Sequence, residues 1–277
     1  NRIAEKISPF YRLANNVVIG TAKYEKLIKT AGMAATRVAE GSTEGEATAP
    51  KYSKVSIEVH TAEVEPWVYN ETLDDAFVNL EADLANEAGI SFAELAGSEF
   101  ITGTGVNGAR GILDYAPVAN ASYSWGKVGY VATTKSGAFA SAAPGDAIIN
   151  LAHALPAKYR QGACFLMNDA TLCAVRQLKD GSGSYYLWQP DPTAPFGGKL
   201  LGFPVEIDEN MPSIGAGAFA IAIANLKAGY TIANRQGVTV IRDNITAKGT
   251  TKFNFRKRWG GGITNFEAIK LLRFATS

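Results

Sequence analysis

The sequence contains little cysteine or histidine, and it has no long apolar run. Only two residues of each type occur among 277, and Cys164, Cys173, His60 and His153 lie too far apart to form a metal-binding motif. We expect two buried free thiols, no disulfide, and neither a metal nor a cofactor. No stretch is apolar for 18 residues and no signal peptide is recognisable, so no membrane association is expected. Asn1 in first position fits either a mature product from which an N-terminal segment was removed or a sequence given without its preceding residues.

Charge is scarce and unevenly distributed. Charged residues make up 19% of the chain, and the net charge is +1, so composition gives no global signal for nucleic-acid binding. A thinly charged surface favours burial against other subunits, although an ordinary β-rich protein can have the same composition. The local balance is +5 over residues 1–37, −4 over residues 40–65 and +6 over residues 248–273.

No catalytic motif has the surroundings it needs. Gly103-Thr-Gly-Val-Asn-Gly108 has the glycine pattern of a nucleotide-binding loop, but such a loop follows a strand and opens a helix, whereas this one follows a helix. We interpret it as a flexible connector. The carboxylates of Asp208-Glu-Asn210 could bind a cation, but a solvated turn explains them better. The two histidines have no partner for acid–base work, so the chain is not expected to be an enzyme.

Two segments near the N-terminus are poor in internal contacts. Residues 1–29 carry apolar side chains without a clear period and are interpreted as an arm lying on the body or on a neighbour. Residues 31–65 predict a long hairpin whose return strand places Val55 and Ile57 on one side. Its tip, residues 41–50, is small, polar and acidic. Because an isolated two-stranded hairpin is marginally stable in water, this one must lie on a partner surface.

Residues 70–101 predict one long helix. Asn70 can cap it, acidic residues follow in its first turn, and apolar residues then recur at three- and four-residue steps. The apolar stripe runs from Leu73 through Phe77 to Leu95. At about 1.5 Å per residue the helix would span roughly 45 Å, with a sheet along one side.

The second half of the chain predicts an α/β unit followed by strands. Asp146 caps a predicted helix, residues 163–167 form a buried strand, and Asn168 or Asp169 caps a further helix that carries Cys173 on its apolar side. The last strands are expected to return to the long helix, which would make the first domain discontinuous.

The segment 252–259 is both basic and aromatic. Its inner face as a strand is expected to carry Phe253, Phe255 and Lys257. The opposite face would carry Arg256 and Arg258. We interpret it as a half-buried strand whose basic face meets DNA phosphates or an acidic neighbour, for which residues 40–65 are a candidate.

Three segments carry a family resemblance. They are Val38-Ala-Glu40 before the hairpin tip, the helix end and glycine-rich connector from Phe100 to Leu113, and Gly198–Val205 followed by Met211-Pro212. Together with the order of the parts, they make nearly the whole chain resemble the tailed-phage major capsid family with the Hong Kong 97-type fold. The resemblance implies an α+β fold with an N-terminal arm, a long hairpin called the E-loop, a peripheral (P) domain built on a spine helix and an antiparallel sheet, and an inserted α/β axial (A) domain. The implied boundaries are 1–30 for the arm, 31–66 for the E-loop, 67–114 and 235–277 for the P-domain with its spine helix 70–101, and 115–234 for the A-domain.

The resemblance also implies a function. Copies would form pentamers and hexamers of an icosahedral shell around double-stranded DNA, which is bound non-specifically, with a portal protein and decoration proteins as further partners. The chain would belong to the virion and assemble in the host cytoplasm. An encapsulin-type nanocompartment, which shares the fold, is the alternative, and a nucleotide-binding α/β enzyme is the lesser one. The expected contacts between subunits are Glu40, Glu44, Glu46, Lys51 and Lys54 of the E-loop, with Arg256, Lys257 and Arg258 of the P-domain as inter-subunit or DNA-facing receivers.

Some members of this family join neighbours by an isopeptide bond between an E-loop lysine and a P-domain asparagine, assisted by a glutamate. Residues 40–49 contain no lysine, and Arg256 and Lys257 stand where the glutamate would be sought. We therefore predict a shell held together without covalent cross-links, with Lys51 and Lys54 as the nearest lysines.

Overall fold

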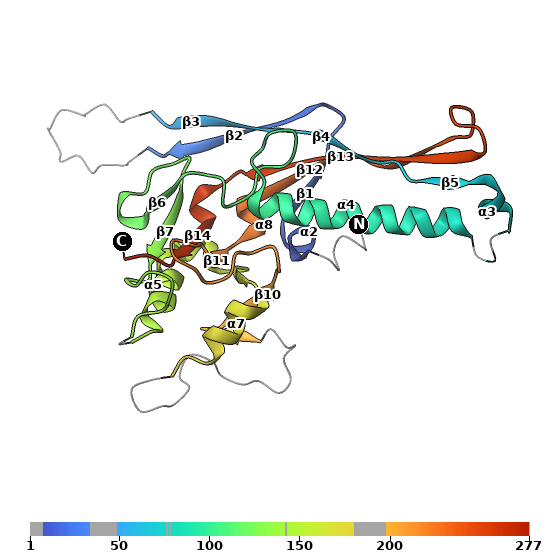
Figure 1. Cartoon of the computed structure of the whole chain (residues 1–277). Helices are drawn as coiled ribbons and strands as arrows, with labels where there is room; N and C mark the ends of the chain where they lie inside the picture. The colour runs from blue at the N-terminus through green and yellow to red at the C-terminus, as the bar shows by residue number, and fades with distance from the viewer. Residues whose placement is uncertain are drawn as a thin grey trace, which may run out of the picture.

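The computed structural model describes residues 8–33, 49–75, 77, 79–141, 143–179 and 198–276. An elongated body carries a two-stranded ribbon along one edge, and the free end of the ribbon projects away from the body (Figure 1). The hairpin tip, with Glu40, Glu44 and Glu46, lies outside the described residues.

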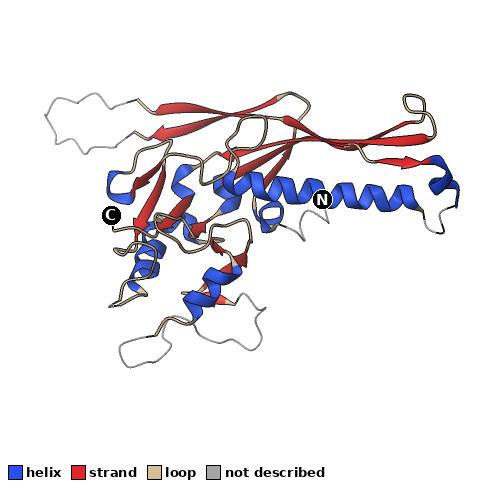
Figure 2. Ribbon diagram, in the orientation of Figure 1, coloured by secondary structure: helices blue, strands red, loops and turns tan. Residues whose placement is uncertain are grey.

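A five-stranded sheet forms the long part of the body. Its path is β1-β12-β13-β4, and β5 pairs with β13. The strands are β1 (Asn15–Val18), β4 (His60–Val64), β5 (Trp67–Tyr69), β12 (Tyr230–Asp243) and β13 (Thr250–Ile263). The predicted alternation of β13 is confirmed, because Phe253 and Phe255 are buried whereas Arg256 is exposed. A sheet with one apolar face must bury that face, and α4 runs alongside this one (Figure 2).

The prediction of one continuous helix over residues 70–101 is wrong. The structure has a short α3 (Asn70–Asp75) and a separate α4 (Leu80–Thr102). Asn79 caps α4 by accepting a hydrogen bond from the Ala82 amide at 3.1 Å. Asn70 does not act as the cap of the long helix; its Oδ1 accepts a hydrogen bond from the Thr251 hydroxyl at 2.7 Å, which ties α3 to the end of the sheet.

The buried residues of α4 begin at Ala88, beyond its first two turns. The buried residues of this helix are Ala88, Phe92, Ala93, Ala96, Gly97, Phe100 and Ile101. The predicted apolar stripe is wrong at two positions, since Phe77 is fully exposed and Leu95 is also exposed, whereas Leu73 and Leu84 pack against the core. With 23 residues, α4 spans roughly 34 Å.

A seven-stranded sheet forms the second unit, in the order β6-β7-β14-β11-β8-β10-β9. The strands are β6 (Pro117–Ala119), β7 (Val128–Ala132), β8 (Cys164–Met167), β9 (Lys199–Leu200), β10 (Phe203–Ile207), β11 (Ile221–Ala224) and β14 (Ile269–Arg273). The helices are α5 (Asp146–Ala154), α6 (Ala157–Arg160), α7 (Asp169–Arg176) and α8 (Leu226–Gly229), with 3-10 turns η1 (Asn120–Ser122) and η2 (Phe266–Ala268). The predicted strand, helix and strand of this region are all present.

Three details of the second unit differ from the predictions. Asp146 does not cap α5, because Gly145 holds the cap position and no side chain bonds there. Cys164 is buried as expected, which raises the pKa of its thiol to about 12, but Cys173 is exposed. The last strand, β14, does not return to α4; it lies between β7 and β11, where four of its five residues are buried. The proposed domain boundaries remain predictions, although this strand joins the second sheet.

The N-terminal residues divide between two parts of the fold. Residues 8–18, the N-terminal segment, contain α2 (Pro9–Leu13) and β1, which pairs in parallel with β12. Residues 23–31 form β2 (Lys23–Ala31), which pairs with β3 (Lys51–Glu58). The hairpin therefore begins at Lys23, inside the range that was predicted to be the arm.

Candidate functional site

The β2–β3 ribbon pairs only with itself. Its register runs from Lys23 opposite Glu58 to Ala31 opposite Lys51, and neither strand belongs to the two larger sheets. Leu27 and Tyr52 are 66% and 59% exposed. A two-stranded ribbon with exposed apolar side chains is marginally stable by itself, so this surface favours a partner.

The base of the ribbon is attached to the body. Ile57 and Val59 are buried in a small cluster with Ala233 of β12, and the Val59 amide donates a hydrogen bond to the Ala22 carbonyl at 3.0 Å. The alternation predicted for the return strand is therefore confirmed at this end. The ribbon is anchored at its base and loses contacts toward its free end.

The lysines predicted for subunit contact lie on the ribbon. Lys51 is exposed at the start of β3, and Lys54 forms an ion pair with Glu25 of β2 at 2.7 Å. A second pair joins Lys23 to Glu58 at 2.5 Å. Exposed ion pairs contribute little to stability. Lys51 and Lys54 are both exposed, so they remain accessible to a partner.

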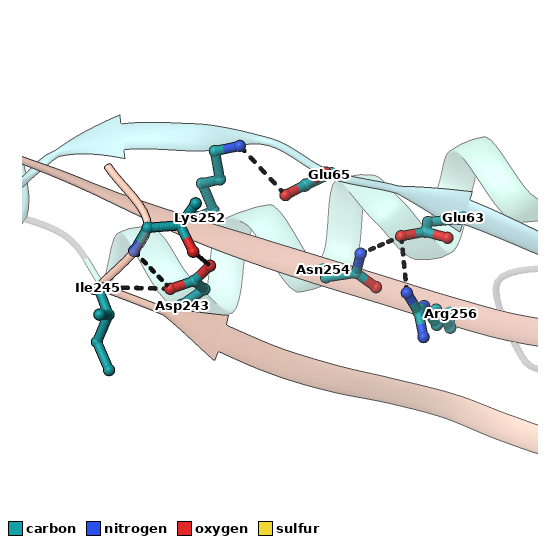
Figure 3. Close-up of polar contacts among 8 residues, drawn as sticks. Glu63, Glu65, Asp243, Ile245, Lys252, Asn254 and Arg256 are labelled. Carbon is teal, nitrogen blue, oxygen red and sulfur yellow. Dashed lines mark hydrogen bonds and ion pairs between the residues drawn. The ribbon is translucent and has the colours of Figure 1, made fainter. Parts of the chain in front are cut away.

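The basic face of β13 meets acidic residues of its own chain (Figure 3). Arg256 lies 3.2 Å from Glu63 of β4, and Lys252 lies 3.6 Å from Glu65. The side-chain amide of Asn254 also donates to Glu63, and these two hydrogen bonds, Asn254 first, hold the pKa of Glu63 below its usual value. Residues 40–65, the acidic segment predicted as a neighbour of this strand, thus contact it within the same chain through Glu63 and Glu65. Arg256 is therefore already paired inside its own subunit.

Lys257 is not available to another subunit. Its side chain is buried, 3.5 Å from the Tyr11 hydroxyl and over the rings of Tyr11 and Trp259. Burial lowers the pKa of this lysine. Its proposed role as a surface receiver is wrong, and the predicted alternation of the strand already placed it inward. Arg258 lies on the opposite, partly exposed face, and its Nε has no hydrogen-bond partner among the described residues.

A cluster of exposed apolar side chains was missed at the far end of the body. Trp67 and Tyr69 of β5 pack edge to face at 5.3 Å, and each is 57% exposed. Ile241 and Ile245 of the adjoining hairpin are exposed as well. The alternation in Trp67-Val-Tyr69 was the available signal, because it places both rings on one face of a strand. Such a cluster is typical of a contact surface.

The glycine-rich connector closes tightly on the end of α4. Gly111 donates from its amide to the Gly103 carbonyl at 2.8 Å, and Ile112 donates to the Phe100 carbonyl at 3.0 Å. Glu99 accepts hydrogen bonds from the Ala109 amide and the Trp259 indole. No helix follows, so the interpretation as a connector holds, but the segment is folded back on the helix instead of being loose.

Asp208 does not lie in a solvated turn. It is buried and accepts hydrogen bonds from the Ser8 hydroxyl at 3.2 Å and from the Asn210 amide at 3.0 Å. Its contacts attach the N-terminal segment to the second unit. Within the described ranges, no group of three potential ligands could hold a metal ion, and no helix is long and apolar enough to cross a membrane.

Comparison with known proteins gives a consistent assignment. A family model described as the phage capsid family matches residues 2–274. The capsid of a native GTA particle, described with C5 symmetry, is 37% identical with a TM-score of 0.92, over 99% of this chain and 90% of the other. Comparison with curated protein sequences finds no match.

More distant structures share the fold. The protein from Mycobacterium phage Bobi is 16% identical with a TM-score of 0.69, over 96% of this chain and 90% of that one. The holo-SrpI encapsulin complex of Synechococcus elongatus PCC 7942 is 13% identical with a TM-score of 0.66, over 98% of this chain and 89% of that one.

Proposed function

The chain belongs to the phage capsid family, and from this premise we propose that its copies form pentamers and hexamers of a closed shell around double-stranded DNA. It is a major capsid protein, a structural component of the virion shell. We also propose that the chain has no catalytic role, that it assembles in the host cytoplasm, and that it contacts a portal protein and decoration proteins.

The observation that carries the proposal is the ribbon. An anchored base and an exposed free end, with Leu27 and Tyr52 uncovered, describe a segment completed by an adjacent copy. Burial of apolar area supplies the stabilisation, at about 25 cal/mol per Å², less the entropy lost on ordering. The exposed cluster around Trp67 and Tyr69 offers a second contact at the other end of the body.

The relatives support the finer arrangement. The GTA protein, 37% identical to this chain, forms the capsid of a particle, which supports a closed particle as the assembly of the present subunit. Encapsulin is the second candidate because it shares the fold, but at 13% identity the likeness supports no statement about cargo. DNA is favoured as content, with contacts to phosphates that are not sequence-specific.

Electron microscopy and size-exclusion chromatography of the purified chain test the proposal. We expect capsomer-sized or megadalton species, closed particles, and DNA protected from nuclease in particles isolated from the producing cell. Particles that contain protein cargo and no DNA would favour the encapsulin alternative. A stable monomer that binds a nucleotide would contradict both readings. Boiled particles should run as monomers on an SDS gel, because the shell is proposed to be non-covalent.

A further inference from the structure

The glycine-rich connector after α4 contains Asn107-Gly108, the one asparagine–glycine pair in the sequence. Asparagine is a thermolabile residue. It is most labile before glycine, because a backbone nitrogen without a neighbouring Cβ reaches the side-chain amide carbon most easily. The exposure of the pair, its hydrogen bonds and the groups beside it decide whether the folded chain permits this attack.

Both amides of the pair are free to react. Asn107 is exposed, and Gly108 is partly exposed. Among the described residues, neither the side-chain amide of Asn107 nor the backbone amide of Gly108 takes part in a hydrogen bond. The next three backbone amides, those of residues 109–111, all donate one. The stretch without hydrogen bonds therefore coincides with the labile pair.

The conformation of the connector requires residues of these two kinds. An added Cβ at Gly108 would lie 2.7 Å from Oε1 of Glu99, so only glycine fits there without a shift. Asn107 has a positive φ of 57°, which asparagine tolerates better than most residues. The fold thus selects the labile pair for its backbone geometry and places a carboxylate against it.

The Glu99 carboxylate is oriented by its other oxygen. Oε2 accepts hydrogen bonds from the Ala109 amide at 3.2 Å and from the Trp259 indole at 3.0 Å. Oε1 accepts none from the described residues and faces Gly108. A carboxylate in this position can take the proton that the Gly108 amide loses when its nitrogen attacks.

A small cavity lies between the pair and the sheet. Asn107, Gly108, Glu99, His60 and Trp259 are among the residues that line it, and its volume is about 10 Å³. This volume is close to the smallest that holds one water molecule, and the lining is polar enough to bind one. Water is the second reactant, because it must open the ring that the attack forms.

We infer that Asn107 is a site of spontaneous modification in the folded subunit, where the Gly108 nitrogen closes a succinimide ring that water opens to aspartate or isoaspartate. The Gly108 nitrogen bonds to Cγ of Asn107, and the bond from Cγ to the side-chain nitrogen breaks. Glu99 takes the proton from the Gly108 amide and passes it to the leaving nitrogen, which departs as ammonia. The net reaction consumes one water and releases one ammonia, without a cofactor or an oxidant. It requires only the folded subunit, so it is independent of the proposed shell.

The modification should loosen the connector. The product adds a carboxylate beside Glu99, and the two negative charges repel each other. Isoaspartate also inserts an extra carbon atom into the backbone of a segment that is folded tightly onto α4. We therefore expect the amides of Arg110 and Gly111, which bond to Gly261 and Gly103, to exchange faster as the subunit ages.

Peptide mapping by mass spectrometry tests the inference. The purified, folded chain is incubated at mildly alkaline pH and sampled over time. We expect the peptide that contains Asn107 to gain about 1 Da and to separate into aspartate and isoaspartate forms. Asn244 is the internal control, because it is also exposed but precedes Ile245, and it should convert at least several-fold more slowly. Conversion at Asn107 that is no faster than at Asn244 would overturn the inference.

The variant Glu99→Gln separates the role of the fold from the lability of the pair. Its side-chain oxygen can still accept the hydrogen bonds from Ala109 and Trp259, but it no longer takes a proton. We expect folded Glu99→Gln to convert several-fold more slowly than the folded parent, and the two chains to convert equally in denaturant. A parent that converts only after unfolding would overturn the inference, and equal rates in the two folded chains would contradict the part assigned to Glu99.

The variant Asn107→Gly is the control for the consequence. Glycine adopts a positive φ without strain and carries no amide to lose. Hydrogen exchange at Arg110 and Gly111 should accelerate with age in the parent and stay constant in Asn107→Gly. Unchanged exchange in a parent whose Asn107 has been converted would show that the connector is not loosened.

Discussion

The N-terminal segment and the ribbon look similar in sequence but differ in how the fold uses them. In the N-terminal segment, Phe10 and Tyr11 are buried against Phe100 of α4, and Phe10 also packs on Tyr230. In the ribbon, Leu27 is exposed. The difference teaches that the N-terminal segment stabilises the subunit, whereas the ribbon remains available to stabilise the assembly.

The largest effect is expected where the N-terminal segment enters the core. Phe10→Ala should lower the free energy of unfolding of the unassembled subunit by about 3–5 kcal/mol, because it leaves a cavity among buried aromatic rings. Leu27→Ala is the matched change in the ribbon and should alter subunit stability by no more than about 0.5 kcal/mol. Thermal or denaturant unfolding of both variants measures the contrast. Equal losses in the two would remove the distinction between the segments.

A smaller loss of subunit stability is expected when the Ser8 hydroxyl is removed, and none when the Thr30 hydroxyl is removed. Ser8 caps α2 and donates to buried Asp208, so Ser8→Ala should cost about 1–2 kcal/mol. Thr30 of the ribbon donates to the Lys51 carbonyl in an exposed position, and Thr30→Ala should leave the unfolding midpoint of the subunit unchanged. Denaturant unfolding under identical conditions compares them. A larger loss for Thr30→Ala would reverse the proposed order.

The pH dependence of stability sharpens the contrast. Burial raises the pKa of Asp208 above its ordinary 3.8, although hydrogen bonds from Asn210 and Ser8 oppose the shift. Its contribution to stability is therefore present below pH 3.8 and is lost as the pH rises through the raised value. Asp208→Asn should remove this pH dependence. As the pH rises from 3.8 through the raised pKa, the free energy of unfolding of the parent should therefore fall relative to that of the variant. Parallel curves for the two chains would contradict the assignment.

Asp243, in the β12–β13 turn, serves as the control of opposite sign. Hydrogen bonds, first from the Thr246 side chain, lower the pKa of Asp243. Its contribution is present above pH 3.8 and is lost as the pH falls through the lowered value. The difference between the parent and Asp243→Asn should therefore shrink in acid, whereas that for Asp208→Asn should change in the opposite direction.

The smallest effects are expected for the exposed ion pairs. Glu25→Gln breaks the pair with Lys54 and should change the free energy of unfolding by less than about 0.5 kcal/mol. Glu206→Gln breaks the pair between Arg12 and the partly buried Glu206, and should cost slightly more. A double-mutant cycle on each pair measures the coupling, and a strong coupling in the ribbon pair would show that the ribbon is stabilised from within.

The alternation of apolar and polar residues that marks strands predicted more of the fold than the three- and four-residue spacing that marks helices. The inner face of β13 followed from alternation alone, including the inward position of Lys257. The prediction of one continuous helix failed because Asn70 and Asn79 are both residues that cap helices well. Hydrogen bonds with Gly249 and Thr251, which are distant in sequence, place Asn70 at the end of the sheet instead.

Long-range pairing limited the other predictions. A run such as Ile269–Arg273 indicates a buried strand but does not say which sheet receives it. The burial of Asp208 depends on Ser8, 200 residues away. A groove lined by β3, the glycine-rich connector, β13 and the loop from Tyr115 to Lys127 combines four parts of the chain, so no local pattern indicated it.

Hydrogen exchange at the ribbon amides tests the central claim most directly. Deuterium uptake by residues 23–31 and 51–58 would be followed by mass spectrometry in the unassembled subunit and in the assembled particle. We expect fast exchange in the subunit and slow exchange in the particle, while the amides of residues 10–14 exchange slowly in both. Equal and strong protection of the ribbon before assembly would contradict the account, because the ribbon would then be complete without its neighbours.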